Sequence, residues 1–183
     1  MVMTFTSFEF FVFIVTFLII YWAFKQCPRS QNAFLLIGCI AFYILNIVEF
    51  DKINERIIDY LLLACVVAIS VLINFKGGIW LEAHKDDPGS RRIFIGLVIF
   101  NVAVLCYYKY LIFYLKIFGN NIASSFIVPI GISFFTFSMI AYLAEIYKGN
   151  TTSEHGLLNF SIFCLFFPKI LAGPIERGPL FLE

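Results

Sequence analysis

Long apolar segments alternate with short polar ones along the chain. An apolar stretch of about 20 residues is long enough for an α-helix to cross the hydrocarbon core of a bilayer. The pattern predicts six such segments, the last of them shorter, at residues 5–24, 32–50, 57–75, 93–115, 126–147 and 157–172. We therefore expect an all-α fold, a polytopic transmembrane helix bundle of about six spans with a broken helix near the C-terminus.

The polar connections carry residues that end helices. The longest connection, 76–92, contains Gly77-Gly78 and Pro88-Gly89, which are typical of turns, and Trp80 inside it indicates an interfacial segment. We expect this stretch to be a loop. In the last apolar segment Pro168 lacks a backbone N–H, so it is expected to break the helix.

Residues 166–179, Phe-Phe-Pro-Lys-Ile-Leu-Ala-Gly-Pro-Ile-Glu-Arg-Gly-Pro, form the most unusual segment. They hold three of the chain's six prolines and two of its eleven glycines, directly after an apolar run. Such a segment cannot continue as a regular helix. Backbone groups freed at membrane depth need protein or water as partners. We expect this segment to lie against other helices and not against lipid.

Composition supports a membrane protein. The chain of 183 residues is 61% hydrophobic and 14% charged, against about 45–50% and about 25% in soluble domains. The net charge of +1 says nothing about partners, and no nucleic-acid partner is expected. The five cysteines form no Cys-x-x-Cys pair, and four of them lie in apolar segments, so neither a disulfide nor a metal site is expected.

Basic residues are divided unequally between the predicted loops. If the N-terminus lies outside, seven fall in cytoplasmic loops: Lys25, Arg29, Lys76, Lys85, Arg91, Arg92 and Lys148. Four fall in the opposite loops: Lys52, Arg56, Lys116 and Arg177. The positive-inside rule then favours an external N-terminus. As a separate expectation, the chain lies in a bacterial cytoplasmic (inner) membrane.

One face of the predicted helix 126–147 is small and polar. At about 100° per residue, Gly131, Ser138, Tyr142 and Glu145 fall within a sector of roughly 60°. Because a polar stripe facing lipid would be costly, we expect this face to point inward. It either packs against neighbouring helices or forms one wall of a substrate tunnel.

Two blocks of sequence resemble one family. The first begins Pro-Ile-Gly-Ile-Ser-Phe-Phe-Thr-Phe at Pro129 and ends at Gly149, and the second is Ala-Gly-Pro-Ile-Glu-Arg, which ends at Arg177. In this order they resemble the membrane-bound O-acyltransferase (MBOAT) family, in its alginate O-acetyltransferase-like branch. Only the first part of that family's domain is covered, so residues 1–183 are expected to form the amino-terminal part of a single MBOAT-like membrane domain.

The resemblance also implies candidate residues for the substrate path or its structural support. Arg177 matches the family's arginine, and Glu145 stands where the family usually has aspartate. Lys109 is similar to the lysine of a Phe-Lys-Tyr element, although a lysine near a span end can equally snorkel to the interface. The full set of candidates is Arg177, Glu176, Lys169, Glu145, Tyr142, Ser138 and Lys109.

No residue of the chain is expected to be catalytic. The family's proposed catalytic histidine lies in a Trp-His-Gly element, preceded by an Arg-Trp-His-x-Ser element, and neither occurs here. His84 and His155 lie in predicted polar connections, where a histidine is usually solvated, and neither is expected to have a nucleophile and an acid in a triad-like arrangement.

Three functions remain open. The resemblance implies a membrane O-acyltransferase that transfers an acetyl group from an acyl thioester or acyl-carrier donor to a hydroxyl of a cell-surface polysaccharide. No bound cofactor is expected. The partners would be the bilayer, the two substrates and either a C-terminal part or a periplasmic acetylation partner. The alternatives are a non-catalytic membrane scaffold subunit that pairs with a separate catalytic chain and, less favoured, a small transporter.

Overall fold

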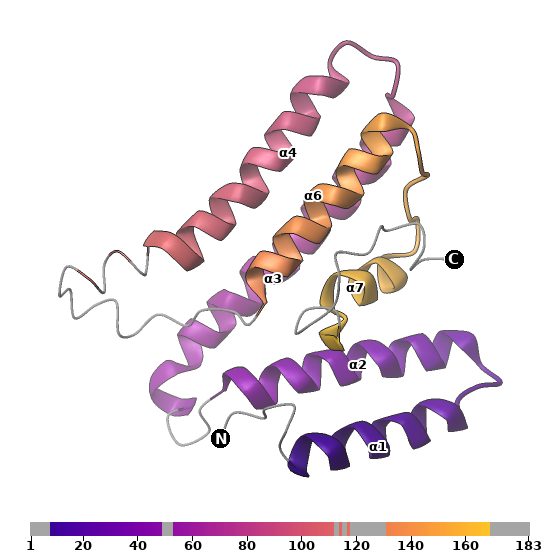
Figure 1. Cartoon of the computed structure of the whole chain (residues 1–183), viewed down its shortest axis with the longest axis vertical. Helices are drawn as coiled ribbons and strands as arrows, with labels where there is room; N and C mark the ends of the chain where they lie inside the picture. The colour runs from indigo at the N-terminus through magenta and orange to yellow at the C-terminus, as the bar shows by residue number, and fades with distance from the viewer. Residues whose placement is uncertain (1–7, 49–52, 112–113, 115–116, 118–130, 169–183) are drawn as a thin grey trace.

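The computed structural model describes residues 8–48, 53–111, 114, 117 and 131–168 (Figure 1). All regular secondary structure in these residues is helical, which confirms the predicted all-α class. The elements are α1 (Phe8–Ala23), α2 (Pro28–Ile47), α3 (Ile53–Ala83), α4 (Ser90–Leu105), the π-helical segment η2 (Cys106–Leu111), α6 (Ile132–Lys148) and α7 (Leu157–Leu165).

The helices form two groups that α7 connects. Helices α3, α4 and α6 pack side by side, and α1 packs against α2 (Figure 1). The short helix α7 contacts α2, α3 and α6. Although α2 and α3 follow each other in the sequence, they diverge in space, and α7 lies between the two groups.

Helix α3 is longer than the sequence pattern predicts. It has 31 residues and continues to Ala83, so the predicted loop 76–92 is wrong and only residues 84–89 separate α3 from α4. Gly77 and Gly78 lie inside the helix, where they allow close packing on two sides. A Cβ atom on Gly77 would lie 2.6 Å from Leu97 in α4, and one on Gly78 would lie 3.0 Å from Tyr142 in α6. Small residues serve this purpose in membrane helices.

This packing predicts opposite effects for two glycine substitutions. Gly78→Ala should lower the free energy of unfolding by about 1 kcal/mol, because the new methyl group meets the buried ring of Tyr142. Gly96→Ala is the control, since a Cβ there meets nothing within 4 Å, and it should stabilise α4 by up to about 1 kcal/mol. Thermal unfolding in detergent measures both, and equal shifts would contradict the packing.

Two buried asparagines join α3 to α4. The Asn74 amide donates to Asn101 Oδ1 at 3.1 Å, and the Asn101 amide donates to Asn74 Oδ1 at 2.7 Å. Each amide uses its second N–H within its own helix, Asn74 to the Ser70 carbonyl at 2.7 Å and Asn101 to the Leu97 carbonyl at 2.8 Å. Hydrogen bonds of this kind hold helices together where there is no water to compete.

Aromatic side chains pack on both sides of α7. Just after its last residue, Phe167 stacks on Phe42 of α2 with ring centres 4.7 Å apart. At the other end Phe160 lies 5.1 Å from the ring of Tyr142 in α6. Helix α7 ends at Leu165 because Phe166 is extended (φ −61°, ψ 102°), so the predicted break occurs two residues before Pro168.

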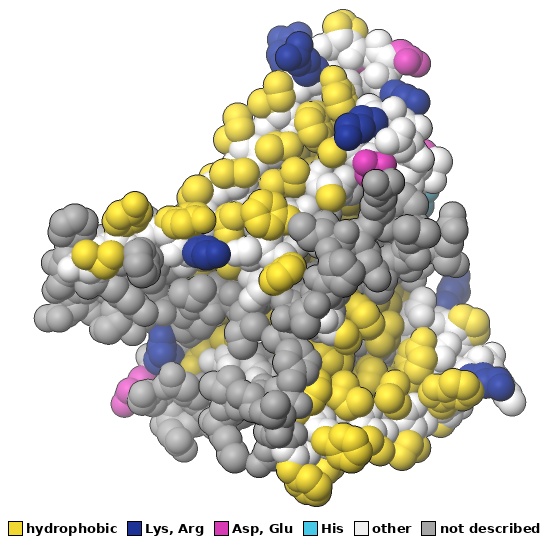
Figure 2. Space-filling view, in the orientation of Figure 1, with side chains coloured by type: hydrophobic (Ala, Val, Ile, Leu, Met, Phe, Trp, Pro, Cys, Tyr) yellow, Lys and Arg dark blue, Asp and Glu magenta, His cyan; other side chains and the backbone are white. Residues whose placement is uncertain are grey.

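The exposed surface is apolar. Phe8, Phe11 and Trp22 of α1 are 63–78% exposed, and hydrophobic side chains cover much of α1 and α4 (Figure 2). By length and composition, three helical segments in the described residues are suited to cross a membrane, Pro28–Ile47, Asn54–Ala83 and Ser90–Tyr110. Soluble proteins rarely expose such large apolar surfaces. The chain is therefore an integral membrane protein.

Candidate functional site

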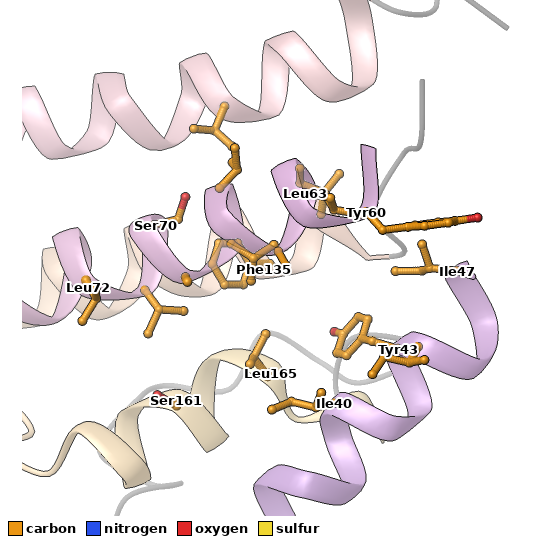
Figure 3. Close-up of a pocket in the computed structure, with 18 of the residues that line it drawn as sticks. Ile40, Tyr43, Ile47, Tyr60, Leu63, Ser70, Leu72, Phe135, Ser161 and Leu165 are labelled. Atoms are coloured by element: carbon orange, nitrogen blue, oxygen red, sulfur yellow. The ribbon is translucent and has the colours of Figure 1, made fainter. Parts of the chain in front are cut away.

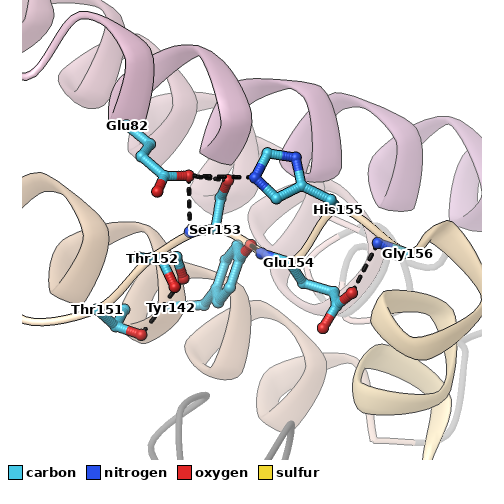
Figure 4. Close-up of polar contacts among 8 residues, drawn as sticks. All are labelled: Glu82, Tyr142, Thr151, Thr152, Ser153, Glu154, His155 and Gly156. Carbon is cyan, nitrogen blue, oxygen red and sulfur yellow. Dashed lines mark hydrogen bonds and ion pairs between the residues drawn. The ribbon is translucent and has the colours of Figure 1, made fainter.

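A polar cluster joins the end of α3 to the connection between α6 and α7. Glu82, in the last turn of α3, accepts a hydrogen bond from the backbone N–H of Ser153 at 2.9 Å and another from the Ser153 hydroxyl (Figure 4). The Nε2 atom of His155 lies 3.7 Å from the same carboxylate oxygen. Two hydrogen-bond donors of Ser153 and the imidazole of His155 thus converge on one oxygen of Glu82.

The same connection is fixed to α6 through Tyr142. The phenol oxygen of Tyr142 accepts a hydrogen bond from the backbone N–H of Glu154 at 2.9 Å, while its ring is buried against Phe160 and Phe163. The Glu154 side chain turns back and accepts from the Gly156 N–H at 2.6 Å, just before α7 begins (Figure 4). These bonds determine where α7 starts relative to α3 and α6.

The geometry favours anchoring over nucleophilic catalysis. In a serine hydrolase triad the imidazole lies between the hydroxyl and the carboxylate. Here the carboxylate of Glu82 lies between Ser153 and His155, and the His155 side chain is 71% exposed. The expectation of an accessible His155 is confirmed. The expectation that His155 has no triad-like arrangement is also confirmed, although α3 brings Glu82 from 71 positions away in the sequence to Ser153.

A polar cavity of about 470 Å³ adjoins this cluster. Its lining residues come from the end of α3, the loop after it, the end of α6 and the connection after α6: Glu82, Lys85, Ile146, Gly149, Asn150, Thr151 and Thr152. Glu145 lies nearby and accepts a hydrogen bond from Asn150 Nδ2 at 3.0 Å. Within the described residues no group of three or more His, Cys, Asp or Glu side chains is placed to hold a metal ion.

The predicted polar face of α6 is partly confirmed. Ser138 and Tyr142 are buried, and Glu145 is half-buried at the end of the helix. Gly131 has a different role from the one expected, because it precedes the first residue of α6 with φ at 71°, a conformation that suits glycine. The contacts of Tyr142 with Gly78 and with the Glu154 backbone are those of helix packing.

An apolar cavity of about 550 Å³ opens between α2 and α3 (Figure 3). It is lined by α2, α3, α6, α7 and the region where α4 meets η2, including Ile40, Leu63, Phe135 and Leu165. Ser138, Tyr142 and Glu145 are not among its lining residues. The polar face of α6 and the apolar cavity are therefore separate features.

The remaining candidates have different settings. Lys109 lies in η2, is exposed, and donates a hydrogen bond to Ser133 Oγ in the first turn of α6 at 3.2 Å. Its ammonium group also lies 5.8 Å from the ring centre of Tyr110. Lys169, Glu176 and Arg177 lie outside the residues that the structure describes.

Sequence reasoning missed Glu82, Ser153, Asn74 and Asn101. Asn74 and Asn101 carry a detectable signal, because an amide inside a long apolar segment needs a partner. Glu82 and Ser153 carry none, since both fall in stretches that read as polar loops and only the folded chain brings them together.

Comparison with known proteins gives consistent relatives. The chain is 32% identical over 177 residues to the probable alginate O-acetylase of Pseudomonas aeruginosa. This alignment covers 91% of the chain and 31% of the relative. It is 30% identical over 177 residues to the probable alginate O-acetylase of Azotobacter vinelandii, and this alignment covers 91% of the chain and 32% of the relative. It is 28% identical over 191 residues to the peptidoglycan O-acetyltransferase of Helicobacter pylori, and this alignment covers 81% of the chain and 36% of the relative.

The chain thus spans about a third of the length of these relatives. No family profile matches the chain. No solved structure matches it either. These relatives agree with the resemblance carried by the blocks at 129–149 and 172–177, and the chain is similar over most of its length to a part of the probable alginate O-acetylases.

Proposed function

We propose that this chain forms part of the membrane domain of an O-acetyltransferase that acts on hydroxyl groups of a cell-surface polysaccharide or a similar acceptor. The similarity of 91% of the chain to probable alginate O-acetylases is the observation that carries this proposal. The apolar helices and the inward-facing side of α6 support a membrane-embedded scaffold. The donor is an acyl thioester or an acylated carrier, and no bound cofactor is required.

The chain supplies scaffold in this proposal, and the general base comes from elsewhere. A general base must lie within hydrogen-bond reach of the proton that it removes. His84 is stacked on Trp80 with ring centres 4.3 Å apart, and its Nδ1 atom lies 3.1 Å from the Trp80 carbonyl oxygen. His155 lies beside Glu82 at the exposed end of the bundle. Both histidines therefore have local structural contacts.

The test compares the chain alone with the chain plus a complement. Purified residues 1–183 are mixed with labelled acetyl donor and alginate, with and without the remaining two thirds of the Pseudomonas aeruginosa relative produced as a separate membrane chain. We expect no transfer by 1–183 or by the complement alone, and measurable transfer when both are present. Transfer by 1–183 alone would contradict the assignment of the base to another region. No transfer by the pair, with both chains in the membrane, would contradict the proposed function.

The alternative role, a scaffold subunit with its own catalytic partner, uses the same contacts. The distinguishing observation is the partner that co-purifies with the chain from its native membrane. A separate chain that carries the Trp-His-Gly element supports the subunit, whereas a continuous polypeptide that includes this element supports a single enzyme.

For the orientation, we propose an external N-terminus in a bacterial inner membrane. The loops 84–89 and 149–156 lie at one end of the bundle, because Glu82 and Ser153 join them. Lys85, Arg91, Arg92 and Lys148 lie at this end. Lys76 lies within α3 and is therefore not counted among the basic residues of the cytoplasmic loops. A periplasm-dependent phosphatase fused before residue 1 should be active, and an inactive fusion that accumulates normally would reverse the orientation.

A further inference from the structure

The apolar cavity between α2 and α3 has the chemistry of a lipid-binding cleft. Its lining is hydrocarbon or aromatic apart from two serines and three tyrosine hydroxyls. The Ser161 hydroxyl is occupied, because it donates to the Leu157 carbonyl of its own helix at 2.7 Å. A cavity that holds water needs several polar partners for each molecule, and an apolar cavity stays dry. Its stable occupant is therefore an apolar group.

The cavity is continuous with the surface that faces the bilayer. Ile40 and Ile44 of α2 and Leu72 of α3 line it, and each is also 42–47% exposed. The same faces of α2 and α3 continue into other exposed apolar side chains, such as Ile37 and Ile69. A lipid chain can thus enter the cavity sideways from the membrane without crossing a polar surface.

The tyrosine side chains of the lining gather toward one end. Tyr43 and Tyr60 lie on the side of Ile47, whereas Leu72 and Ser161 lie at the opposite end (Figure 3). Tyr108 packs in the same cluster as Leu63, which is next to Tyr60 in the figure. Tyrosine prefers the level of the lipid headgroups, where its ring is in hydrocarbon and its hydroxyl reaches polar groups. One end of the cavity is therefore suited to the headgroup region and the other to a chain end.

The volume decides between a lipid chain and a protein helix. A helix of 20 residues is about 30 Å long and about 10 Å wide, which corresponds to roughly 2,400 Å³. The cavity holds about 550 Å³, several times less. Only the side chains of a neighbouring helix could enter it, whereas a single flexible hydrocarbon chain fits the space between the diverging helices.

We propose that this cavity binds one acyl chain of a membrane phospholipid, with the headgroup near Tyr43 and Tyr60. The bound acyl chain fills the space between the α1–α2 pair and the α3–α4–α6 group and so supports the position of α7. This inference does not depend on the proposed acetyl transfer, because it needs only a membrane-embedded bundle and the geometry of the cavity.

The first test measures retained lipid. Residues 1–183 are produced in bacterial membranes, extracted in mild detergent and weighed by native mass spectrometry. We expect about one phospholipid per chain and at least a fivefold loss in Ala68→Trp, because Ala68 lines the cavity. Ala103→Trp is the matched control, since Ala103 is exposed on α4 outside the lining, and it should retain the lipid. No retained lipid, or equal retention in both variants, would overturn the proposal.

The second test uses the unmodified chain, so it remains valid if the Ala68→Trp variant does not fold. The unmodified chain is placed in phosphatidylethanolamine vesicles that carry a photoreactive group at the end of one acyl chain, then extracted, irradiated and mapped by peptide mass spectrometry. Label at Phe135 and Leu165, which line the cavity and are not exposed, supports the proposal. Label confined to exposed residues such as Phe11, or a cavity occupied by another protein segment, contradicts it.

Discussion

Replacing Glu82 by alanine is expected to lower the free energy of unfolding by about 2–3 kcal/mol, because hydrogen bonds to a charged group contribute more than neutral ones. The substitution leaves both the backbone N–H and the hydroxyl of Ser153 without their acceptor, and Ser153 is buried. The contact with His155 is also lost, although its exposure makes this a small part of the effect. Thermal unfolding in detergent measures the change.

The position of α7 should change together with the stability. Without Glu82, the connection 149–156 loses its hydrogen bonds to α3 and keeps those to α6, such as the bonds to Tyr142 and Glu145, so limited proteolysis should cut this connection faster than in the unmodified chain. Asp86→Ala is the matched control, because Asp86 is an exposed acid in the next loop. An unfolding temperature for Glu82→Ala that equals the control would show that the cluster does not anchor the connection.

The second large effect is expected at the asparagine pair. Replacing Asn101 by leucine should cost about 1–3 kcal/mol, because the buried Asn74 amide then loses one donor contact and one acceptor contact. Replacing both asparagines by leucine removes the unpaired amide and should recover much of the loss. The double substitution is therefore expected to be more stable than the sum of the single ones predicts.

A double-mutant cycle measures this coupling. The four proteins, unmodified, Asn74→Leu, Asn101→Leu and the double variant, are unfolded under identical detergent conditions. A coupling of about 0.5–2 kcal/mol is expected for a direct contact between membrane helices. Strictly additive effects would mean that α3 and α4 are held together by their apolar side chains alone.

The fold class could be predicted because the apolar segments are long and few residues interrupt them. The boundary of α3 could not, because Gly77-Gly78 and Trp80 have the composition of a turn at the membrane interface. In the folded chain the same glycines face Leu97 and Tyr142 at close range. A glycine pair indicates either a turn or close helix packing, and only the neighbouring helices decide between them.

Residues of the candidate site could be predicted from the sequence only where they lie on the same helix. The spacing of Ser138 and Tyr142 correctly indicated a buried face, since both lie on α6 and share its periodicity. The cluster of Glu82, Ser153 and His155 combines two elements far apart in the sequence, and no local pattern connects them. Arg177 and Glu176, which rest on the family resemblance, stay predictions.

The most direct measurement of the central claim is the acetyl content of alginate made by a Pseudomonas aeruginosa strain whose alginate O-acetylase carries this chain in place of its matching region. The proposed function predicts acetylated alginate, because the chain would supply an equivalent part of the membrane domain. A chimera that reaches the membrane at normal levels but produces alginate without acetyl groups would contradict it.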